Sequence, residues 1–310
     1  MHIGKIMAEI GEVFKTFRKG KNITLKEASS GIVSYTFLSK FERGLTDISF
    51  MHLLELLDRI NVQLSEFEFS YQKSNNYLND FLPSLQKAYQ SSDIDSLNDH
   101  LRRWQNKSDK FSKLQAIQIK MMLTTLGKAT ITGDEINTLQ NYFQSITNWT
   151  FFELYLFGHA IPFLEERFML NLFLELQKKA ILYDLFRYDS FSMLFYIYNN
   201  MILHMLEQKN AVVAQQLLDN LISYFQNQER DYYHRARLLN LKGLTLYTGD
   251  NKESGLMLIK KSNVITFLIH DDAQFVLNEK NYLSKFLSKD ELEDVFKFKN
   301  VDLTHLNSFD

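Results

Sequence analysis

The scarcity of helix-breaking residues constrains the fold of this chain more than any other feature. Its 310 residues include only 2 prolines and 11 glycines. A sheet protein of this size needs many turns, which these two residues usually supply. Hydrophobic residues make up 45% of the chain, which is enough for a sizeable core. The sequence therefore predicts an all-α fold.

The stretch from Thr24 to Asp47, TLKEASSGIVSYTFLSKFERGLTD, has the pattern of two short helices joined by a tight turn. Thr24 and Glu27 have the spacing of a capping box, in which each side chain bonds a backbone amide of the other residue, and this predicts a helix start at Thr24. Gly31 can adopt the left-handed conformation that a tight turn between helices needs. The first half of the stretch therefore predicts a short helix followed by a turn.

The second half of the stretch predicts a helix with one buried and one exposed side. Ser34 is suited to cap its start, and Gly44 marks its end. Phe37, Leu38 and Phe41 would form the buried side. In a helix-turn-helix unit, early residues of the second helix meet the base edges of DNA and later ones meet phosphates. The residues left facing outward are Tyr35, Thr36, Ser39, Lys40 and Arg43.

Basic side chains are concentrated around this unit, although the whole chain has a net charge of −2. The segment from Lys15 to Arg43 contains seven Lys and Arg residues against two Glu. A DNA-binding surface needs such a local excess, because binding releases the counterions of the phosphates that it contacts. For Lys19 and Lys21, a phosphate contact and a solvated position are equally consistent with the sequence.

The run SYTFLSKFERG, followed by ISFMHLLELLDRINVQLSEF, closely resembles the amino-terminal domain of Rgg/MutR-type transcriptional regulators. These regulators belong to an RRNPP-like group found in Gram-positive bacteria. Members of the group respond to peptide pheromones and carry an Xre-like helix-turn-helix. The resemblance covers about residues 4 to 68. It implies that the first helix, about Gly4 to Arg18, ends against the DNA backbone, so that Lys15 and Arg18 contact phosphates. We expect Glu42 either to orient Arg43 or to pair within its own domain. The predicted DNA contacts are Lys15, Arg18, Ser34, Tyr35, Thr36, Ser39, Lys40 and Arg43.

We place the domain boundary after residue 68, where the sequence becomes polar and aromatic. Residues 1–68 are expected to form the helix-turn-helix domain, and residues 69–310 a tetratricopeptide-like solenoid of stacked helical hairpins. The clearest repeat spans about residues 231 to 266 and has small and large residues at the offsets typical of such repeats. Small residues there let the two helices of a hairpin pack closely. These positions are Gly243, Leu246, Gly249, Gly255, Ile259 and Ser262.

The repeat domain is the expected site for a ligand and for dimerisation. The family resemblance implies a short hydrophobic signalling peptide, and the concave face of a solenoid suits an extended peptide. Asn in an apolar helix costs desolvation unless it is paired, and an Arg can hold a peptide carboxylate. The alternative is that these side chains bond neighbouring helices or lie on the surface. The candidate peptide contacts are Arg187, Tyr188, Asn199, Asn200, Arg237 and Asn240.

Several other functions are disfavoured by the sequence. The chain has no cysteine, and its 8 histidines form no HExxH or HxxxH pair, so we predict neither a metal site nor a cofactor. No GxSxG motif is present, and an enzyme is not expected. The amino terminus lacks the features of a signal peptide. The apolar stretch from Ser190 to Leu206 contains two Asn and a His, which favours a buried helix over a membrane span. We therefore expect a cytoplasmic protein without a membrane partner.

Together these features predict a sequence-specific transcriptional regulator that is controlled by a hydrophobic signalling peptide, as in quorum sensing. The resemblance also implies a homodimer that binds double-stranded DNA at a promoter operator, with RNA polymerase as a further candidate partner. Two alternatives remain open. One is an orphan regulator that responds to another ligand or to none. The other is a helical-repeat adaptor whose amino-terminal domain contacts protein rather than DNA.

Overall fold

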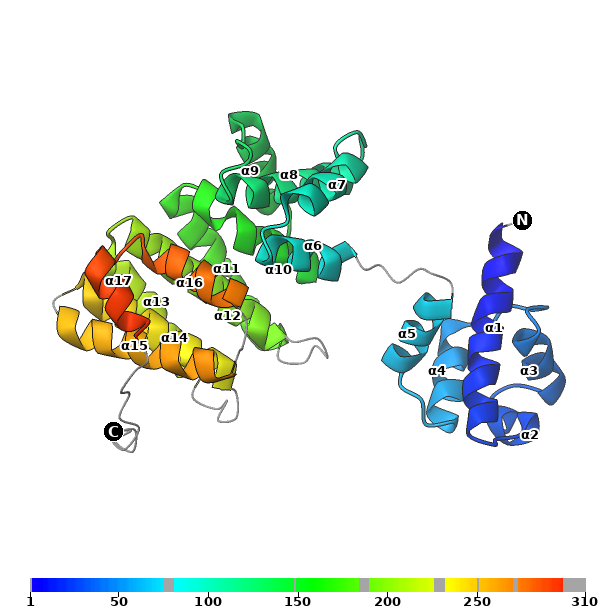
Figure 1. The fold of residues 1–310 in the computed structure, drawn as a ribbon. Helices are drawn as coiled ribbons and strands as arrows, with labels where there is room; N and C mark the ends of the chain where they lie inside the picture. The colour runs from blue at the N-terminus through cyan, green and yellow to red at the C-terminus, as the bar shows by residue number, and fades with distance from the viewer. Residues whose placement is uncertain are drawn as a thin grey trace. The chain divides into compact units, whose positions relative to one another are not determined.

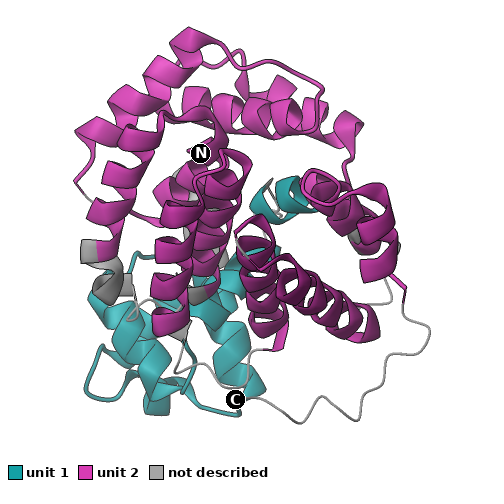
Figure 2. Cartoon of the chain, turned by 90° about the vertical axis from the view of Figure 1, so that its left-hand side faces the viewer, with its two compact units in different colours: residues 1–87 teal, residues 88–310 magenta. Residues whose placement is uncertain are grey.

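Helices form the part of the chain that the computed structural model describes, namely residues 2–74, 81–147, 149–183, 190–225, 232–249, 251–269 and 273–297 (Figure 1). Within these residues there is no β-strand. The all-α prediction is therefore confirmed. The chain divides into two units, Met1–Lys87 and Ala88–Asp310, which Figure 2 shows in different colours.

The first unit contains the predicted helix-turn-helix. The capping box between Thr24 and Glu27 is present, and Ser34 caps the second helix of the motif by accepting a hydrogen bond from the Phe37 amide. Gly31 has a φ of 77°, the left-handed conformation predicted for the turn. The helices of this unit are α1 (His2–Gly20), α2 (Leu25–Ser29), α3 (Tyr35–Glu42), α4 (Phe50–Arg59) and α5 (Leu64–Ser74).

A single hydrophobic core holds these five helices together. Phe14 of α1 and Leu38 of α3 are fully buried in it, and Phe14 packs against the ring of Phe41. Phe67 of α5 is buried in the same core, and Tyr71 packs against it. These two side chains pack α5 onto the helix-turn-helix. The boundary that we predicted after residue 68 lies within α5, which ends at Ser74.

The second unit is a series of antiparallel helical hairpins. The apolar stretch from Ser190 to Leu206 forms α12 and buries Ile197 and Met201 completely. Within the described part of the chain, no helix is both long enough and apolar enough to cross a membrane. The division between the units falls within α6. The helices from there on are α6 (Phe81–Gln90), α7 (Ile94–Trp104), α8 (Lys110–Thr125), α9 (Gly133–Ser145), α10 (Phe151–Ala160), the 3₁₀ helix η1 (Ile161–Phe163), α11 (Glu166–Tyr183), α12 (Ser190–Glu207), α13 (Ala211–Phe225), α14 (Tyr232–Thr248), α15 (Lys252–Ile269), α16 (Ala273–Leu283) and α17 (Lys289–Val295).

Alternate helices of the second unit lie next to one another. Helices α8, α10, α12 and α14 contact each other in turn, and α15 contacts α17. The predicted repeat at about residues 231 to 266 corresponds to the hairpin α14–α15. A Cβ atom on Gly243 would lie 2.9 Å from the Gly255 carbonyl oxygen, and one on Gly255 would lie 2.7 Å from that of Gly243. The predicted close packing of this hairpin is confirmed, since only glycine fits at both positions.

Candidate DNA-binding surface and ligand site

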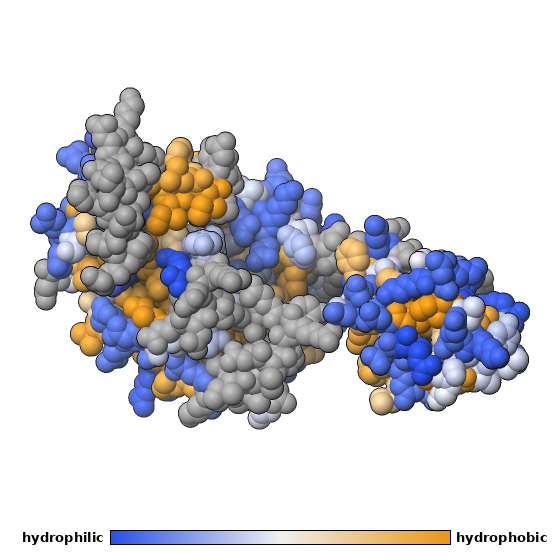
Figure 3. Space-filling model, turned by 90° about the horizontal axis from the view of Figure 1, so that it is seen from below, coloured by the Kyte–Doolittle hydropathy of each residue, from blue (hydrophilic) through white to orange (hydrophobic). Residues whose placement is uncertain are grey.

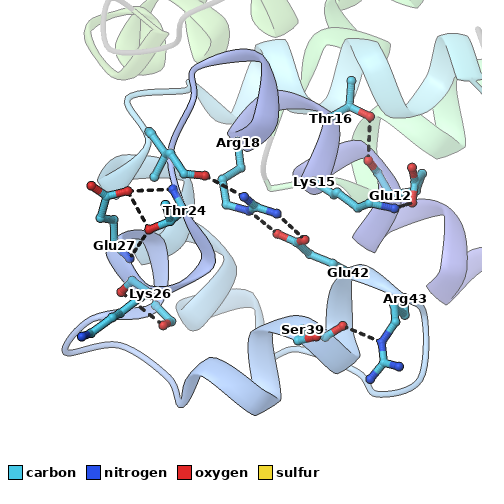
Figure 4. A network of polar contacts seen from close by, with 12 residues as sticks. Glu12, Lys15, Thr16, Arg18, Thr24, Lys26, Glu27, Ser39, Glu42 and Arg43 are labelled. Atoms are coloured by element: carbon cyan, nitrogen blue, oxygen red, sulfur yellow. Dashed lines mark hydrogen bonds and ion pairs between the residues drawn. The ribbon is translucent and has the colours of Figure 1, made fainter.

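The outward side of α3 carries polar and basic side chains, whereas its inward side is anchored in the core. Tyr35 remains 54% exposed, and Thr36 and Lys40 are also exposed. Arg43, just after the helix, is exposed, and its Nε donates a hydrogen bond to the Ser39 carbonyl 3.1 Å away (Figure 4). This bond uses one of the five donors of the guanidinium, so the others can meet a phosphate or a base.

Two further predicted contacts have partners of their own at the surface. The Ser34 hydroxyl accepts a hydrogen bond of 3.1 Å from the Phe37 amide, so it acts as a helix cap whether or not it meets DNA. Lys15 Nζ lies 2.7 Å from a Glu12 carboxylate oxygen on the same helix. An exposed pair of this kind contributes only about 0–1 kcal/mol, so DNA phosphate can compete for the lysine.

Arg18 does not belong to this surface. The residue is 5% exposed, and its side chain points inward between α1 and α3 (Figure 4). Its Nε and Nη2 donate to the two carboxylate oxygens of Glu42 at 2.5 and 2.7 Å, and its Nη1 donates to the Ile23 carbonyl at 2.6 Å. The structure therefore contradicts the phosphate contact predicted for Arg18. Of the two roles expected for Glu42, pairing within its domain is the one observed.

The pair between Arg18 and Glu42 links the end of α1 to the end of α3. Its hydrogen bonds, together with the Glu42 charge, raise the pKa of Arg18 above the ordinary value despite burial. Near the pair, α1 and α3 touch through their backbones, because an added Cβ on Gly11 would lie 2.0 Å from the Phe41 carbonyl oxygen. The orientation of α3 is thus determined by buried contacts with α1.

Sequence reasoning missed several residues around this motif. Arg59 of α4 donates through Nη1 to the Ser30 carbonyl at 2.8 Å and so supports the turn after α2. Leu45, Phe50 and Met51 are more than half exposed, and Figure 3 shows an apolar area on this unit among hydrophilic side chains. For Phe50 and Met51 the helical phase could have indicated this exposure, because these two residues of the first turn of α4 lie outside the stripe of buried leucines that follows.

In the second unit, four of the six candidate peptide contacts meet in one hydrogen-bonded network. Arg237 Nε donates to Asn199 Oδ1 at 2.7 Å, Asn199 Nδ2 donates to Asn200 Oδ1 at 2.9 Å, and Asn200 Nδ2 donates to the Gly158 carbonyl at 3.0 Å. The network thus joins α10, α12 and α14, so Asn199, Asn200 and Arg237 bond neighbouring helices, which is the alternative given above to a peptide contact. The other two candidates, Arg187 and Tyr188, lie outside the described residues.

Glu279 of α16 completes this network, and the sequence did not indicate it. Arg237 Nη1 donates to both Glu279 carboxylate oxygens, at 2.8 and 3.0 Å, and Asn240 Nδ2 donates to one of them at 3.0 Å. Burial acts to lower the pKa of Arg237, but the charge of Glu279, the two neighbouring tyrosines Tyr282 and Tyr233 and the hydrogen bond to Glu279 together outweigh it and keep this pKa above the ordinary value. The Arg237 guanidinium also lies 5.9 Å from the ring centre of Tyr282.

Two buried polar atoms beside this ion pair lack a hydrogen-bond partner within the described part of the chain. They are Oδ1 of Asn240 and the hydroxyl of Tyr282. Buried polar groups are nearly always hydrogen-bonded, so such a pair of atoms marks a place where a bound molecule would find partners. No three His, Asp or Glu side chains among the described residues gather in a group that could hold a metal ion.

Comparison with family models identifies both units. Residues 96–274 match the model for the C-terminal domain of the HTH-type transcriptional regulator Rgg, and residues 14–67 match a helix-turn-helix model. The Rgg match spans more than half of the chain. The chain belongs to the Rgg family. Its members are transcriptional regulators and not enzymes, and the resemblance seen in the sequence is therefore confirmed.

Solved structures share this fold at low sequence identity. A protein from Listeria monocytogenes EGD-e has a TM-score of 0.76 at 21% identity, over 89% of this chain and 98% of that one. The SHP pheromone receptor Rgg2 of Streptococcus dysgalactiae has 0.69 at 19%, over 89% and 99%. A bacterial peptide pheromone/receptor complex has 0.67 at 17%, over 90% and 98%. These similarities support the Rgg fold, an amino-terminal helix-turn-helix followed by a helical domain.

Proposed function

We propose that this Rgg-family chain is a sequence-specific DNA-binding regulator whose activity is controlled by a short hydrophobic signalling peptide, in the manner of quorum sensing. The observation that carries the peptide part is the pair of buried polar atoms, Asn240 Oδ1 and the Tyr282 hydroxyl, that lack a partner among the described residues and lie beside the network of Asn199, Asn200 and Arg237. Two solved proteins of this fold are described as a pheromone receptor and a pheromone/receptor complex, which supports the same reading.

The outward side of α3 is the proposed reader of DNA. Tyr35 and Thr36 stand at the start of the helix, where side chains reach base edges, and Lys40 and Arg43 stand at its end, where they reach phosphates. Ser34, Ser39 and Lys15 complete the proposed contact surface. Arg18 is left out, because its donors are used inside the core.

The proposed peptide contacts suit the backbone of an extended chain. Asn side chains offer both a donor and an acceptor, so they can pair with peptide amides, and the surrounding helices supply apolar contacts. The network joins alternate helices of the second unit, so one peptide lying across them would touch α10, α12 and α14 together. A peptide bound there would therefore change how these helices pack.

The proposed control is thermodynamic linkage. If the chain acts as a homodimer, two α3 helices would meet the two half-sites of an operator, and the spacing of these helices would set the affinity. A peptide that binds one arrangement of the dimer better than another shifts the population towards it. The same shift would change the contact between the two DNA-binding units of the dimer and RNA polymerase.

The proposed DNA binding is tested by fluorescence anisotropy with labelled DNA from the promoters that flank the gene encoding this chain. Binding should weaken steeply with salt. The Lys40→Ala and Arg43→Ala variants should each bind more weakly, and loss of one phosphate contact should reduce the salt slope by about 1. Lys73→Ala is the matched control, since Lys73 is an exposed lysine on α5 of the same unit.

The peptide part is tested in the same assay by adding peptides encoded beside the gene. A peptide that changes the dissociation constant for DNA supports the proposal. Tight DNA binding that is indifferent to every peptide would instead favour the orphan regulator. Failure to bind any DNA at any salt concentration would favour the helical-repeat adaptor.

A further inference from the structure

The ion pair between Arg237 and Glu279 has an incomplete geometry. A strong Arg–carboxylate pair uses two guanidinium nitrogens, each on its own carboxylate oxygen. Arg237 instead places the single nitrogen Nη1 on both oxygens of Glu279, while its Nε is bonded to Asn199. The two-nitrogen fork that best recognises a carboxylate is therefore not formed.

The pair is also partly accessible to solvent. The side chains of Arg237 and Glu279 are 20% and 15% exposed, so a bound molecule can reach them without unfolding the unit. Buried next to them are the Asn240 Oδ1 atom, which needs a donor, and the Tyr282 hydroxyl, which has none of its hydrogen bonds formed within the described residues.

The carboxy-terminal end of a peptide supplies what these groups lack. Its carboxylate can accept hydrogen bonds from Arg237 and from the Tyr282 hydroxyl, and its last backbone amide can donate to Asn240 Oδ1. A side-chain carboxylate such as that of Glu279 can do the first but brings no amide donor to Asn240.

We infer that Glu279 is an internal substitute for the ligand: it holds Arg237 when no peptide is bound, and the free carboxy terminus of the peptide displaces it. This inference rests on the proposed peptide-binding function and specifies its chemistry. Displacement frees α16 from α14, because the bonds from Arg237 and Asn240 to Glu279 join these two helices. Peptide binding is thereby coupled to a change in the packing of α16.

The test compares two synthetic pools of octapeptides composed of Leu, Ile, Val and Phe and labelled at the amino terminus, one with a free carboxy terminus and one with an amidated one. Anisotropy of each pool is titrated with the full chain. The wild type should prefer the free-acid pool. Glu279→Gln removes the competing charge, so this variant should bind the free-acid pool about tenfold more tightly than the wild type, and the amidated pool with unchanged affinity.

Glu207→Gln is the matched control. Glu207 ends α12 and pairs at 2.8 Å with Lys285 just after α16, so this variant loses a nearby carboxylate that does not touch Arg237. It should bind both pools as the wild type does. Where Glu279→Gln does not fold, as judged by circular dichroism, the double variant Arg237→Met/Glu279→Leu replaces the pair with apolar side chains and should bind the two pools equally.

Three results would overturn the inference. If peptides bind but Glu279→Gln gains nothing for the free-acid pool, or if the wild type binds amidated peptides as tightly as free acids, the role of Glu279 is wrong while the proposed peptide control stands. If neither pool binds any variant, and no peptide encoded beside the gene changes DNA binding, the proposed peptide control itself fails, and the role of Glu279 fails with it.

Discussion

Each unit of this chain contains an arginine paired with a glutamate, and the two pairs differ in burial and in geometry. Arg18 uses two nitrogens on the two oxygens of Glu42, and the side chains are 7% and 4% exposed. Arg237 uses one nitrogen on both oxygens of Glu279, and the side chains are 20% and 15% exposed. The first pair has the two-nitrogen geometry and is almost completely buried, whereas the second lacks that geometry and is partly exposed.

This difference separates a structural pair from one that can respond to a ligand. Both arginines are plausible ligand contacts from the sequence, one for DNA phosphate and one for a peptide. A buried pair whose two carboxylate oxygens each accept from a separate guanidinium nitrogen cannot exchange partners without leaving a buried charge unpaired, which costs several kcal/mol. A partly exposed pair beside unsatisfied polar atoms can exchange its carboxylate for another one.

Breaking the Arg18–Glu42 pair should have the largest effect on stability. Glu42→Gln leaves the Arg18 charge buried without a partner, and we expect it to destabilise the first unit by about 3–5 kcal/mol. The loss should be seen as faster amide hydrogen exchange in α1 and α3. Both tryptophans, Trp104 and Trp149, lie in the second unit, so the thermal transition followed by tryptophan fluorescence should not change.

A double variant distinguishes the loss of the pair from the loss of a carboxylate. Arg18→Met/Glu42→Leu replaces both charges with apolar side chains, and we expect it to recover most of the lost protection. If Glu42→Gln exchanges as slowly as the wild type, the pair is not structural, and the contrast between the two units does not hold.

Acid should weaken the second unit through His159. Its side chain is buried among Tyr89, Tyr155 and Tyr196, and burial lowers its pKa to about 4 from the ordinary 6.5. Between these values the unfolded chain binds a proton that the folded unit does not. Stability is therefore lost as pH falls from 6.5 towards 4, by up to about 3 kcal/mol. Tryptophan fluorescence during thermal unfolding at pH 7 and pH 5 measures this loss.

His159→Gln should flatten this pH dependence. Burial also lowers the pKa values of His100 and His204, so part of the dependence will remain. A variant that is as acid-sensitive as the wild type would show that His159 is not the group responsible.

The close contact between Gly11 of α1 and the Phe41 carbonyl of α3, near the Arg18–Glu42 pair, should tolerate no side chain at position 11. Gly11→Ala places a Cβ against the Phe41 carbonyl, and we expect a loss of about 1–3 kcal/mol in the stability of the first unit. Gly20→Ala, at the end of the same helix, is the control, because nothing lies within 4 Å of its added Cβ. Hydrogen exchange of α1 and α3 compares the two variants. Equal protection in both would contradict the close contact between these helices.

Helix caps should give the smallest effects and act within their own units. Thr24→Ala and Ser288→Ala each remove a capping box and should cost about 1 kcal/mol. Hydrogen exchange should rise in α2 for the first variant and in α17 for the second. A change that spreads into the other unit would argue against two separately stabilised units.

Local features of this fold were predictable from the sequence, and pairings between distant residues were not. The caps at Thr24 and Ser34 and the close glycines of the hairpin α14–α15 depend on residues a few positions apart, or on one repeat pattern. The partner of Arg18 lies 24 positions away, and that of Arg237 lies 42 positions away. The sequence around each arginine does not indicate its partner, because only the packing of the helices brings the two residues together.

The same limit explains the errors at the candidate sites. Arg18 has the right residue type and position for a phosphate contact, but the phase of α1 turns it towards Glu42. The residues around Glu279 in the sequence are typical of a solvated helix surface. Only the packing of α16 against α14 brings Glu279 into contact with Arg237 and Asn240.

Amide hydrogen exchange of the full chain, with and without the free-acid octapeptide pool, tests the central contrast most directly. We predict that the peptides change the protection of α12, α14 and α16, while the amides around Arg18 and Glu42 keep theirs. Changed protection around Arg18 and Glu42, with none in α12, α14 and α16, would contradict the distinction between a fixed pair and a ligand-responsive pair.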